Sequence, residues 1–362
     1  MSRDKRIFIS DVHLGMKVGQ IPPGKYDYTW LKDNAANDLT LFFQYLNIAA
    51  DVSEVILLGD IFDDWLCPVD RQPPTMRELI ASHQGEPIIT ALQTLARNPN
   101  LRVIFLPGNH DMDVTADVLA TFFPGMILGG LAKNDCAYRS SRLLAEHGSA
   151  HALFNAPDYT NARTTGLPLG YFLTRVVTTR AYNTGHDKES PFTIIMGLLD
   201  AAGHDKFAEA SLDAVLREAK LPLATPIKMP SGGPESEISA QTVRARYGSV
   251  YQQWIATRGS IIALDGILAE VKELGFIADS LCTKGDTNVV IFGHSHAPKI
   301  ERRVSPAGYP FIYANCGSWC EKDQPRTFVE AEKNQDNRTQ TIRLVEWQNG
   351  RVGKITEQTI EL

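Results

Sequence analysis

The sequence predicts an α/β fold with a largely parallel, buried sheet that is interrupted by a long helical insertion. Three near-continuous apolar runs, RIFISD, EVILLGD and RVIFLPGNHD, end in or close to Gly and Asp, and stretches with helical periodicity lie between them. This βαβα alternation is typical of parallel strands that helices bury on both faces. Strand-like runs return near the C-terminus after the helical stretch.

The first 159 residues form the first part of this predicted core. Residues 6–11, 54–60 and 102–111 are the three apolar runs and predict strands. The stretch NDLTLFFQYLNIAA, residues 37–50, predicts a helix because its apolar residues recur three and four positions apart. The stretch LLAEHGSAH at residues 143–151 predicts a further strand that ends at His147. We therefore expect polar side chains wherever these strands end.

The pattern changes to helical periodicity between residues 160 and 285, which we interpret as an inserted lid domain. A break rich in Pro, Gly and Ser, PIKMPSGGPES, divides it. Scattered arginines on helices are typical of a solvated face. The five helical stretches are LPLGYFLTRVVTTR, PFTIIMGLLDAAG, DKFAEASLDAVLREAK, AQTVRARYGSVYQQWIATR and IIALDGILAEVKELG, and the arginines are Arg163, Arg175, Arg180, Arg244 and Arg246.

Residues 286–362 predict the second part of the core. The runs VVIFGH, FIYANCG, TFVEAE and TIRLVEW are strand-like, and short polar turns join the later ones. Short turns are typical of antiparallel strands. We expect an antiparallel edge or a second sheet in this part of the chain.

Composition and charge exclude some classes of protein. The chain has 362 residues, 43% of them hydrophobic and 22% charged, with a formal net charge of −6. A protein that grips nucleic acid non-specifically carries a basic excess, which is absent here. The N-terminal residues MSRDKRIFIS contain no apolar segment long enough for a signal peptide or a spanning helix, so we expect a cytoplasmic protein.

The cysteines favour a reducing compartment. There are five of them, an odd number without a paired framework. Cys316 and Cys320 are the one close pair, and no second pair completes a tetrahedral zinc site beside them. We interpret both as packing thiols.

Polar side chains follow five of the predicted strands. An Asp after a strand is often a helix cap, and a single His is usually structural, so one cluster alone indicates little. Five clusters at one sheet edge would place carboxylates close together, which divalent cations would stabilise, and mixed Asp, His and Asn donors suit manganese, iron or zinc. One shared carboxylate can hold two ions about 4 Å apart. The clusters are Asp11 and His13; Asp60 and Asp63; Asn109, His110 and Asp111; His147; and His294 and His296.

The motifs DVH, GDIFD, GNHD, HG and GHSH, in this order, resemble the five signature motifs of the calcineurin-like metallophosphoesterases. The resemblance implies a four-layer αββα sandwich, two divalent metal ions and a hydroxide between them that attacks phosphorus. Mn²⁺ is the expected ion, with Fe, Zn or Mg as alternatives. Carried over to this chain, the first metal has the ligands Asp11, His13 and His296, the second has Asn109, His147 and His294, and Asp60 bridges both.

The resemblance also implies roles for residues that do not bind metal. His110 matches a histidine beside the substrate phosphate that stabilises charge or protonates the leaving oxygen, and Asp63 matches the carboxylate that orients it. We expect Asp111 and Asp113 to cap the helix that follows them. His151, four residues after His147, is expected at the surface.

The expected activity is hydrolysis of a phosphodiester or diphosphate. The stretches FISDVHLG, GDIFDDW and NCGSW are similar to those of the UDP-2,3-diacylglucosamine pyrophosphatase branch, whose lid holds lipid. The chain departs from that branch in carrying His110 where many members have Arg, and in its longer insertion. The implied partner is a small lipidic or nucleotide substrate, with peripheral membrane contact as one way to reach it.

Three alternatives lie within reach of the same motifs. A phosphomonoesterase needs only an open site around one phosphoryl group. A nuclease would show a basic track or an aromatic stacking platform, which the acidic net charge disfavours. A non-catalytic scaffold is expected to lose metal ligands, and this chain retains a residue of the right type at every position.

Overall fold

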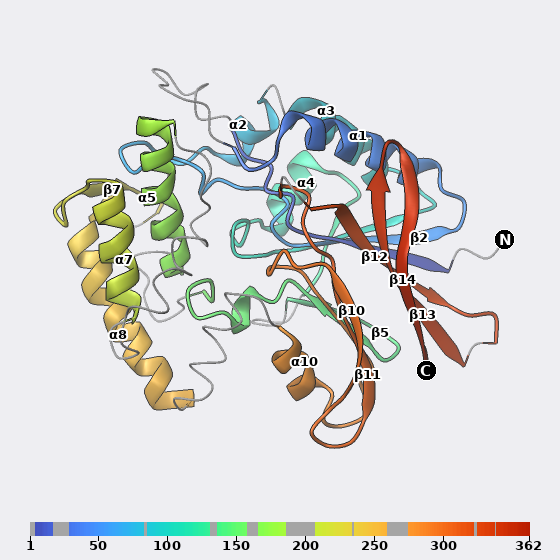
Figure 1. The fold of residues 1–362 in the computed structure, drawn as a ribbon. Helices are drawn as coiled ribbons and strands as arrows, with labels where there is room; N and C mark the ends of the chain where they lie inside the picture. Colours follow the sequence, from blue (N-terminus) through green and yellow to red (C-terminus); the bar gives the residue numbers. More distant parts are fainter. Residues whose placement is uncertain are drawn as a thin grey trace.

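The computed structural model describes residues 4–16, 29–82, 85–130, 136–157, 166–185, 207–233, 235–258, 274–321, 324–336 and 338–362. Two sheets lie face to face with helices on their outer faces, and a group of helices stands at one end (Figure 1). The mixed α/β class expected from the sequence is confirmed.

The first sheet has seven strands in the order β14-β13-β12-β1-β2-β3-β4. Strands β1 to β4 run parallel to one another, and β12, β13 and β14 add to the β1 side as antiparallel neighbours. This is the predicted combination of a parallel centre with an antiparallel edge. The strands are β1 (Lys5–Ile9), β2 (Val52–Leu58), β3 (Arg102–Leu106), β4 (Ile127–Leu128), β12 (Arg326–Lys333), β13 (Thr339–Gln348) and β14 (Arg351–Glu361).

The second sheet has five strands in the order β10-β11-β9-β6-β5. Its three central strands, β6, β9 and β11, are parallel, while the edge strands β5 and β10 pair antiparallel. Both sheets therefore have a parallel centre whose strand ends meet at one edge. The strands are β5 (Ala137–Ser140), β6 (Leu143–Glu146), β9 (Val289–Phe292), β10 (Lys299–Val304) and β11 (Pro310–Asn315).

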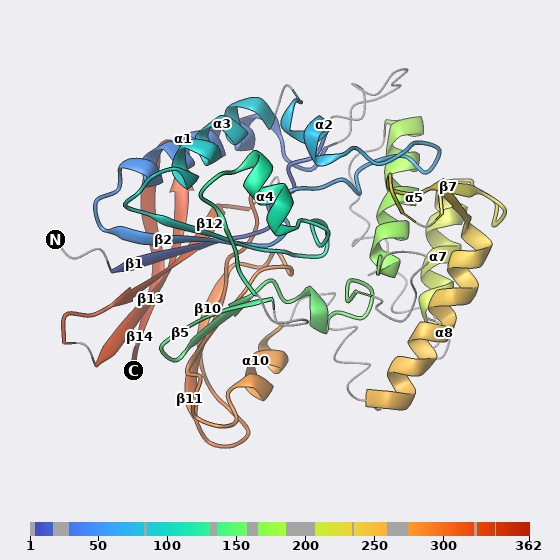
Figure 2. The same ribbon diagram turned by 180° about the vertical axis from the view of Figure 1, so that it is seen from behind.

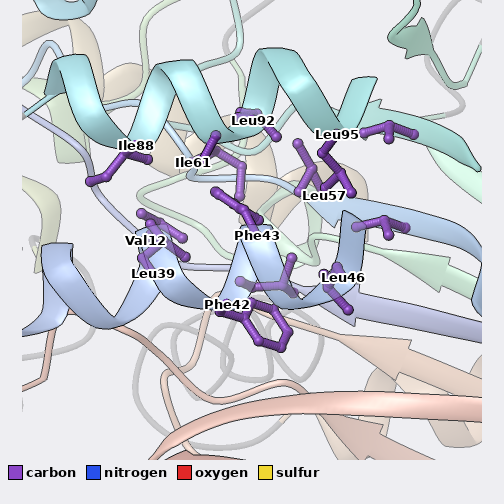
Figure 3. Packing of buried hydrophobic residues seen from close by; sticks show 14 of the residues in the cluster. Val12, Leu39, Phe42, Phe43, Leu46, Leu57, Ile61, Ile88, Leu92 and Leu95 are labelled. Atoms are coloured by element: carbon purple, nitrogen blue, oxygen red, sulfur yellow. The ribbon is translucent and has the colours of Figure 1, made fainter. Parts of the chain in front are cut away.

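Helices cover the outer face of the first sheet (Figures 1 and 2). Phe42 and Phe43 of α1 and Leu92 of α3 are fully buried against residues such as Leu57 of β2, as Figure 3 shows. Thr115 caps the short α4 by accepting a hydrogen bond from the Val118 N–H. The helices are α1 (Asp33–Ile48), α2 (Met76–Ile80), α3 (Gly85–Ala96) and α4 (Ala116–Phe122).

The alternation of side chains along each strand builds a separate core between the sheets. Ile56 and Leu58 of β2 point into it and meet Ile291 of β9, whereas Leu57 faces the helices. On the far side of the second sheet, α10 (Gly275–Leu281) packs against Val290 and Phe292. The resulting order of helices, sheet, sheet and helix is the predicted αββα sandwich.

The insertion gathers at one end of the sandwich in both views (Figures 1 and 2). Its described elements share one hydrophobic cluster, to which Trp65 and Val69 of the core also belong. The insertion is therefore packed onto the core through the segment that follows β2. The elements are α5 (Leu169–Thr184), α7 (Phe207–Glu218), β7 (Pro226–Lys228), β8 (Glu237–Ser239) and α8 (Ala240–Arg258).

The structure differs from the sequence expectations in four strands of the chain. The Pro- and Gly-rich break forms a hairpin, β7–β8, because Ile227 and Ile238 pair and are both buried. Strands β10 and β14 were not predicted, since charged residues fill both. The stretches PFTIIMGLLDAAG and most of IIALDGILAEVKELG, with Arg163, lie outside the described residues.

No helix among the described residues is long and apolar enough to cross a membrane. All five cysteines are free, and Cys136 alone among them is exposed.

Candidate metal centre

The loops after six parallel strands meet at one edge of the sandwich. Asp11 and His13 follow β1, Asp60 follows β2, and Asn109 follows β3 in the first sheet. The second sheet contributes three more residues: His147 after β6, and His294 and His296 after β9. A further loop, after β11, joins them through the Trp319 N–H, which donates to the Asp11 main-chain oxygen at 3.0 Å. All seven predicted metal ligands are thus brought together.

Hydrogen bonds from main-chain N–H groups of the β9 loop hold the loops together at this edge. The Asp11 carboxylate accepts from the His294 N–H at 2.9 Å, and the His147 carbonyl accepts from the Gly293 N–H at 3.1 Å. These bonds fix the β9 loop relative to the β1 and β6 loops. The side chains of both sheets are therefore held in register before any ligand binds.

One group of donors centres on His13. Its Nε2 lies 3.2 Å from the Nε2 of His296, and that nitrogen lies 3.3 Å from Oδ1 of Asp11. The Sγ of Cys320 belongs to the same group, with all three ligand atoms of His13, His296 and Cys320 within 4.8 Å of one another. These distances suit donors that converge on one cation.

A second group centres on Asp60 and His147. The Nε2 of His147 lies 3.1 Å from Oδ2 of Asp60 and 3.2 Å from Oδ1 of Asn109. The ring of His294 lies against that of His147, with centroids 5.2 Å apart. The same Asp60 oxygen is 3.8 Å from Nε2 of His13, so this carboxylate lies between the two groups.

Outer partners orient three of the imidazoles. His13 Nδ1 lies 2.9 Å from Oδ2 of Asp63, His147 Nδ1 lies 2.9 Å from the Leu58 carbonyl, and His296 Nδ1 lies 2.9 Å from Oε1 of Glu321. Each acceptor fixes the proton on Nδ1, so the unprotonated Nε2 presents its lone pair to the centre. This arrangement is typical of histidines that bind metal through Nε2.

The backbone of the centre is unusual. Asp11, His13, Asp60, His294 and His296 all have positive φ, between 51° and 65°. Non-glycine residues rarely adopt this left-handed conformation, and such residues cluster at functional sites.

A glycine permits a close approach within the same loops. A Cβ on Gly108 would lie 2.2 Å from Oδ1 of Asp60. The Gly in the GNHD motif is therefore required for the Asp60 side chain to reach its place.

The electrostatics of the centre favour positive charge. Burial disfavours the charged form of His147, but the carboxylates of Asp60 and Asp11 outweigh it and raise its pKa to about 9. Burial acts the same way on His296, yet Asp11 raises its pKa to about 10. Burial and the neighbouring His147 lower the pKa of His294 to about 3, which leaves a neutral imidazole.

The donor set fits divalent cations. Asp11 and Asp60 are buried carboxylates, and the buried Nε2 of His294 has no hydrogen-bond partner within the described part of the chain. Asp60 belongs to two sets of potential ligand atoms, one with His13 and His110 and one with His147 and His294. A buried nitrogen lone pair beside paired carboxylates is the environment that a cation stabilises.

His110 and Asp63 lie beside the centre. The Asp63 Oδ2 that accepts from His13 is also 3.0 Å from Nδ1 of His110, but this second contact lacks the alignment of a hydrogen bond. Although burial opposes it, Asp63 raises the pKa of His110. Asp63 thus forms its aligned hydrogen bond with His13 and lies close enough to His110 to favour its protonated form.

Sequence reasoning missed four residues around the centre. Glu321 and Asn155 hold His296 and Asn109 through hydrogen bonds of 2.9 and 3.0 Å. Trp65 and the partly exposed Trp30 lie against His110, with ring centroids 3.9 and 5.5 Å away. Only GDIFDDW carried a local signal, because Trp65 is its last residue; the other contacts join residues far apart in sequence.

The expected capping role of Asp111 is wrong. Thr115 caps α4, and Asp111 is instead buried with its carboxylate accepting from four main-chain N–H groups. The donors belong to Asp60, Ile61, Phe62 and Gly108, at 2.7 to 3.3 Å. Asp111 therefore joins the GDIFD and GNHD loops.

The structure also shows the surroundings of His151 and of two arginines of the insertion. His151 is partly buried, and its Nε2 pairs with Oε1 of Glu146 at 2.6 Å. Arg244 forms an ion pair with Asp213, as expected of a solvated face. Arg175 contradicts that expectation, because its side chain is fully buried.

The family comparison agrees with this site. Residues 5–223 match the model of the calcineurin-like phosphoesterase family, which is more than half of the chain. The protein therefore belongs to the calcineurin-like phosphoesterases. No curated protein matches the chain.

Similar solved structures include sorting and anchoring proteins. Vacuolar protein sorting 29 from Cryptosporidium parvum is 9% identical, with 99% of this chain and 98% of that chain covered and a TM-score of 0.33. Vps29 from Chaetomium thermophilum is 10% identical, with 99% and 98% covered and a TM-score of 0.31. GAP50, the anchor in the inner membrane complex of Plasmodium, is 10% identical, with 99% and 89% covered and a TM-score of 0.33. Scores this low carry no argument about function.

Proposed function

We propose that the protein is a dinuclear-metal-dependent hydrolase of phosphodiester or diphosphate bonds. The observation that supports this most is the place of Asp60, whose Oδ2 lies 3.1 Å from His147 Nε2 and 3.8 Å from His13 Nε2. A carboxylate between two sets of donors is what a pair of bridged cations requires. In this proposal Asp11, His13 and His296 hold one ion, Asn109, His147 and His294 hold the other, and Asp60 joins them.

The chemical types of the proposed ligands favour a first-row divalent metal ion. Carboxylate, amide and imidazole groups suit Mn²⁺, which is our first choice, with Fe, Zn or Mg as alternatives. When bound, such ions supply Lewis-acid activation of water and neutralise charge at the phosphoryl group. The outer partners Asp63, Glu321 and the Leu58 carbonyl keep three imidazoles in the tautomer that binds.

His110 is the proposed acid or charge stabiliser. Its ring lies beside His13, with centroids 4.6 Å apart, and Asp63 favours its protonated form through charge. A protonated imidazole at this place would stabilise negative charge on the phosphoryl oxygens and supply a proton to the leaving oxygen. A ligand atom of His110 also lies within 4.8 Å of those of His13 and Asp60, so the proposed acid lies directly beside the donors of the centre.

The insertion supports a substrate larger than a single phosphoryl group. It packs beside the GDIFD loop, where it would form one wall of the site and contact the non-reacting part of the substrate. Together with the motif resemblance, this favours an enzyme of the UDP-2,3-diacylglucosamine pyrophosphatase-like branch. The proposed substrate carries an organic group on each side of the bond that is broken.

The proposal is tested by metal content and hydrolysis together. Purified protein supplied with Mn²⁺ should bind two ions per chain and hydrolyse bis(p-nitrophenyl) phosphate or a nucleotide diphosphate ester faster than p-nitrophenyl phosphate. Asp60→Ala should lose both ions and essentially all hydrolysis while remaining folded, because the residue lies at a strand end.

Asp213→Ala is the matched control. This carboxylate pairs with Arg244 on the insertion and should retain both metal and rate. A wild-type protein that binds no divalent metal, or an active Asp60→Ala variant, would overturn the proposal. Faster hydrolysis of the monoester would identify a phosphomonoesterase instead.

A further inference from the structure

Trp65 packs directly on His110. The two rings are stacked, with centroids 3.9 Å apart and planes 27° from parallel. Trp65 is 1% exposed, and its main-chain N–H donates to Oδ1 of Asp63 at 2.9 Å. The tryptophan that follows the GDIFDD residues is therefore fixed at its backbone and covers one face of the proposed acid.

The ring orientation of His110 depends on such packing. The torsion that rotates an imidazole ring is intrinsically broad, so a ring without an aligned hydrogen bond is held by its neighbours. Nδ1 of His110 is buried and lies 3.0 Å from Oδ2 of Asp63, but this contact is not aligned as a hydrogen bond. Three aromatic rings surround the His110 ring among the described residues: Trp65, which stacks on one face, His13, and the more distant Trp30, whose ring centroid lies 5.5 Å away.

Trp65 is in turn supported by the insertion. Tyr171 of α5 packs edge-on against it, with centroids 5.6 Å apart and planes at 85°. Both side chains belong to the hydrophobic cluster of the insertion, and Tyr171 is fully buried. The core of the insertion thus extends without a gap to the residue that stacks on His110.

Arg175 anchors this part of α5 to the segment after Trp65. Its guanidinium donates to the main-chain oxygens of Cys67, Pro68 and Arg71, at 2.6 to 2.8 Å, and also to the Tyr171 hydroxyl. Thr179, one turn further along α5, accepts from the Val69 N–H at 2.9 Å. α5 and residues 67–71 are therefore joined by hydrogen bonds that are buried from water.

We infer that α5 of the insertion sets the orientation of His110 through Tyr171 and Trp65, and that Trp65 is a positioning residue for the reaction. This inference rests on the proposed function, because it assigns His110 its chemical role. It changes the expected role of the insertion: this face of it is a fixed support for the reacting groups, in addition to any contact with substrate.

The inference predicts an effect on turnover with little effect on binding. Trp65→Ala should lower kcat by roughly 10- to 100-fold, because small misplacements of a reacting group cost up to about 10² in rate. KM and metal content should stay within about twofold of the wild type. Trp65→Phe should recover most of the rate, since a phenyl ring can still stack on the imidazole.

A double mutant separates positioning from general damage. If Trp65 acts through His110, then Trp65→Ala should cause no further loss of kcat in a His110→Ala background. The loss in the single variant should also be larger for a diester with an alkyl leaving group than for one with p-nitrophenol, because the poorer leaving group needs the proton more. Tyr171→Leu should lower kcat in the same direction by a smaller factor.

Trp347→Ala is the matched control. Trp347 of β13 is 3% exposed and packs on Phe42 of α1, and its indole nitrogen has no hydrogen-bond partner among the described residues. Its removal should lower stability and leave kcat within about twofold. Equal losses of kcat in the Trp65 and Trp347 variants would overturn the inference, as would a Trp65→Ala loss that multiplies with that of His110→Ala.

A second measurement does not depend on activity. In wild-type protein with ¹³C-labelled histidine, the Cε1–H signal of His110 should be shifted upfield by the Trp65 ring, and Trp65→Phe should retain part of that shift. No change in this signal in either Trp65 variant would refute the stacking on which the inference depends. A wild type that shows the shift but hydrolyses no phosphoester would instead refute the proposed function alone.

Discussion

The buried guanidinium of Arg175 allows a stability prediction to be worked out from individual contacts. Arg175→Met keeps a long unbranched side chain but removes every donor. Four main-chain carbonyls then lose a partner: those of Cys67, Pro68, Arg71 and Lys228. When both partners of a buried ion pair are side chains, both can be replaced by apolar groups at little cost in stability. The partners of Arg175 are main-chain carbonyls, which no substitution can make apolar.

The expected size of the effect follows from three of those acceptors, because the Pro68 carbonyl keeps the Arg71 N–H as a donor at 3.1 Å. An unsatisfied buried acceptor costs about 1–3 kcal/mol, and carbonyls with two lone pairs fall at the lower end. We therefore expect Arg175→Met to lower the free energy of unfolding by about 3 kcal/mol. Because the acceptors belong to residues 67–71 and to β7, the damage should begin where α5 meets the core.

Urea unfolding followed by circular dichroism measures the loss, and hydrogen exchange locates it. Arg244→Met is the control, since Arg244 is on the same insertion but its side chain is 39% exposed and pairs with Asp213. An exposed pair contributes about 0–1 kcal/mol. The reasoning fails if the two variants lose the same stability, or if amide exchange in α5 and residues 67–71 is unchanged in Arg175→Met.

Two further predictions concern the residues that support the centre. Glu321→Ala, which removes the acceptor of His296 Nδ1–H, should weaken binding of one metal ion by about 10- to 100-fold, whereas Glu321→Gln should retain much of the affinity. Calorimetric titration with Mn²⁺ measures both affinities. Equal affinities in wild type and Glu321→Ala would contradict the assignment. Asp111→Ala should lower the free energy of unfolding by about 3 kcal/mol in chemical unfolding and also reduce the metal content, because four main-chain donors around Asp60 lose their acceptor. A variant that is destabilised but binds both ions normally would show that Asp111 supports only the fold.

The sequence predicts the parallel centre of the sandwich well because those strands are buried on both faces. In β2, Ile56 faces the second sheet and Leu57 faces the helices, so the run of letters is continuously apolar. Strands β10 and β14 escaped prediction because they are edges, whose charged residues such as Arg303 and Lys354 make ion pairs at the surface. Local apolar patterning carries no signal for such strands.

The residues of the candidate site also fall into a group that the sequence predicts and a group that it does not. The seven predicted ligands follow strands within short motifs, so their meeting could be predicted from the strand order alone. Glu321, Asn155 and Arg175 act through contacts with residues 25 to 108 positions away in the chain. Asp111 shows a further limit, since an Asp before a helix is an ordinary cap until the structure shows that Thr115 takes that place.

The left-handed backbone of the centre has a consequence for folding. A left-handed conformation costs roughly 1–2 kcal/mol for an ordinary residue and less for Asp. His13, His294 and His296 alone therefore store a few kcal/mol, a substantial share of the roughly 5–15 kcal/mol that stabilises a typical domain. Glycine adopts this conformation freely. A version of the protein with glycine at these histidines would lose the proposed metal donors but also this strain. Cations that bind only the folded form would offset the strain of the natural sequence by mass action.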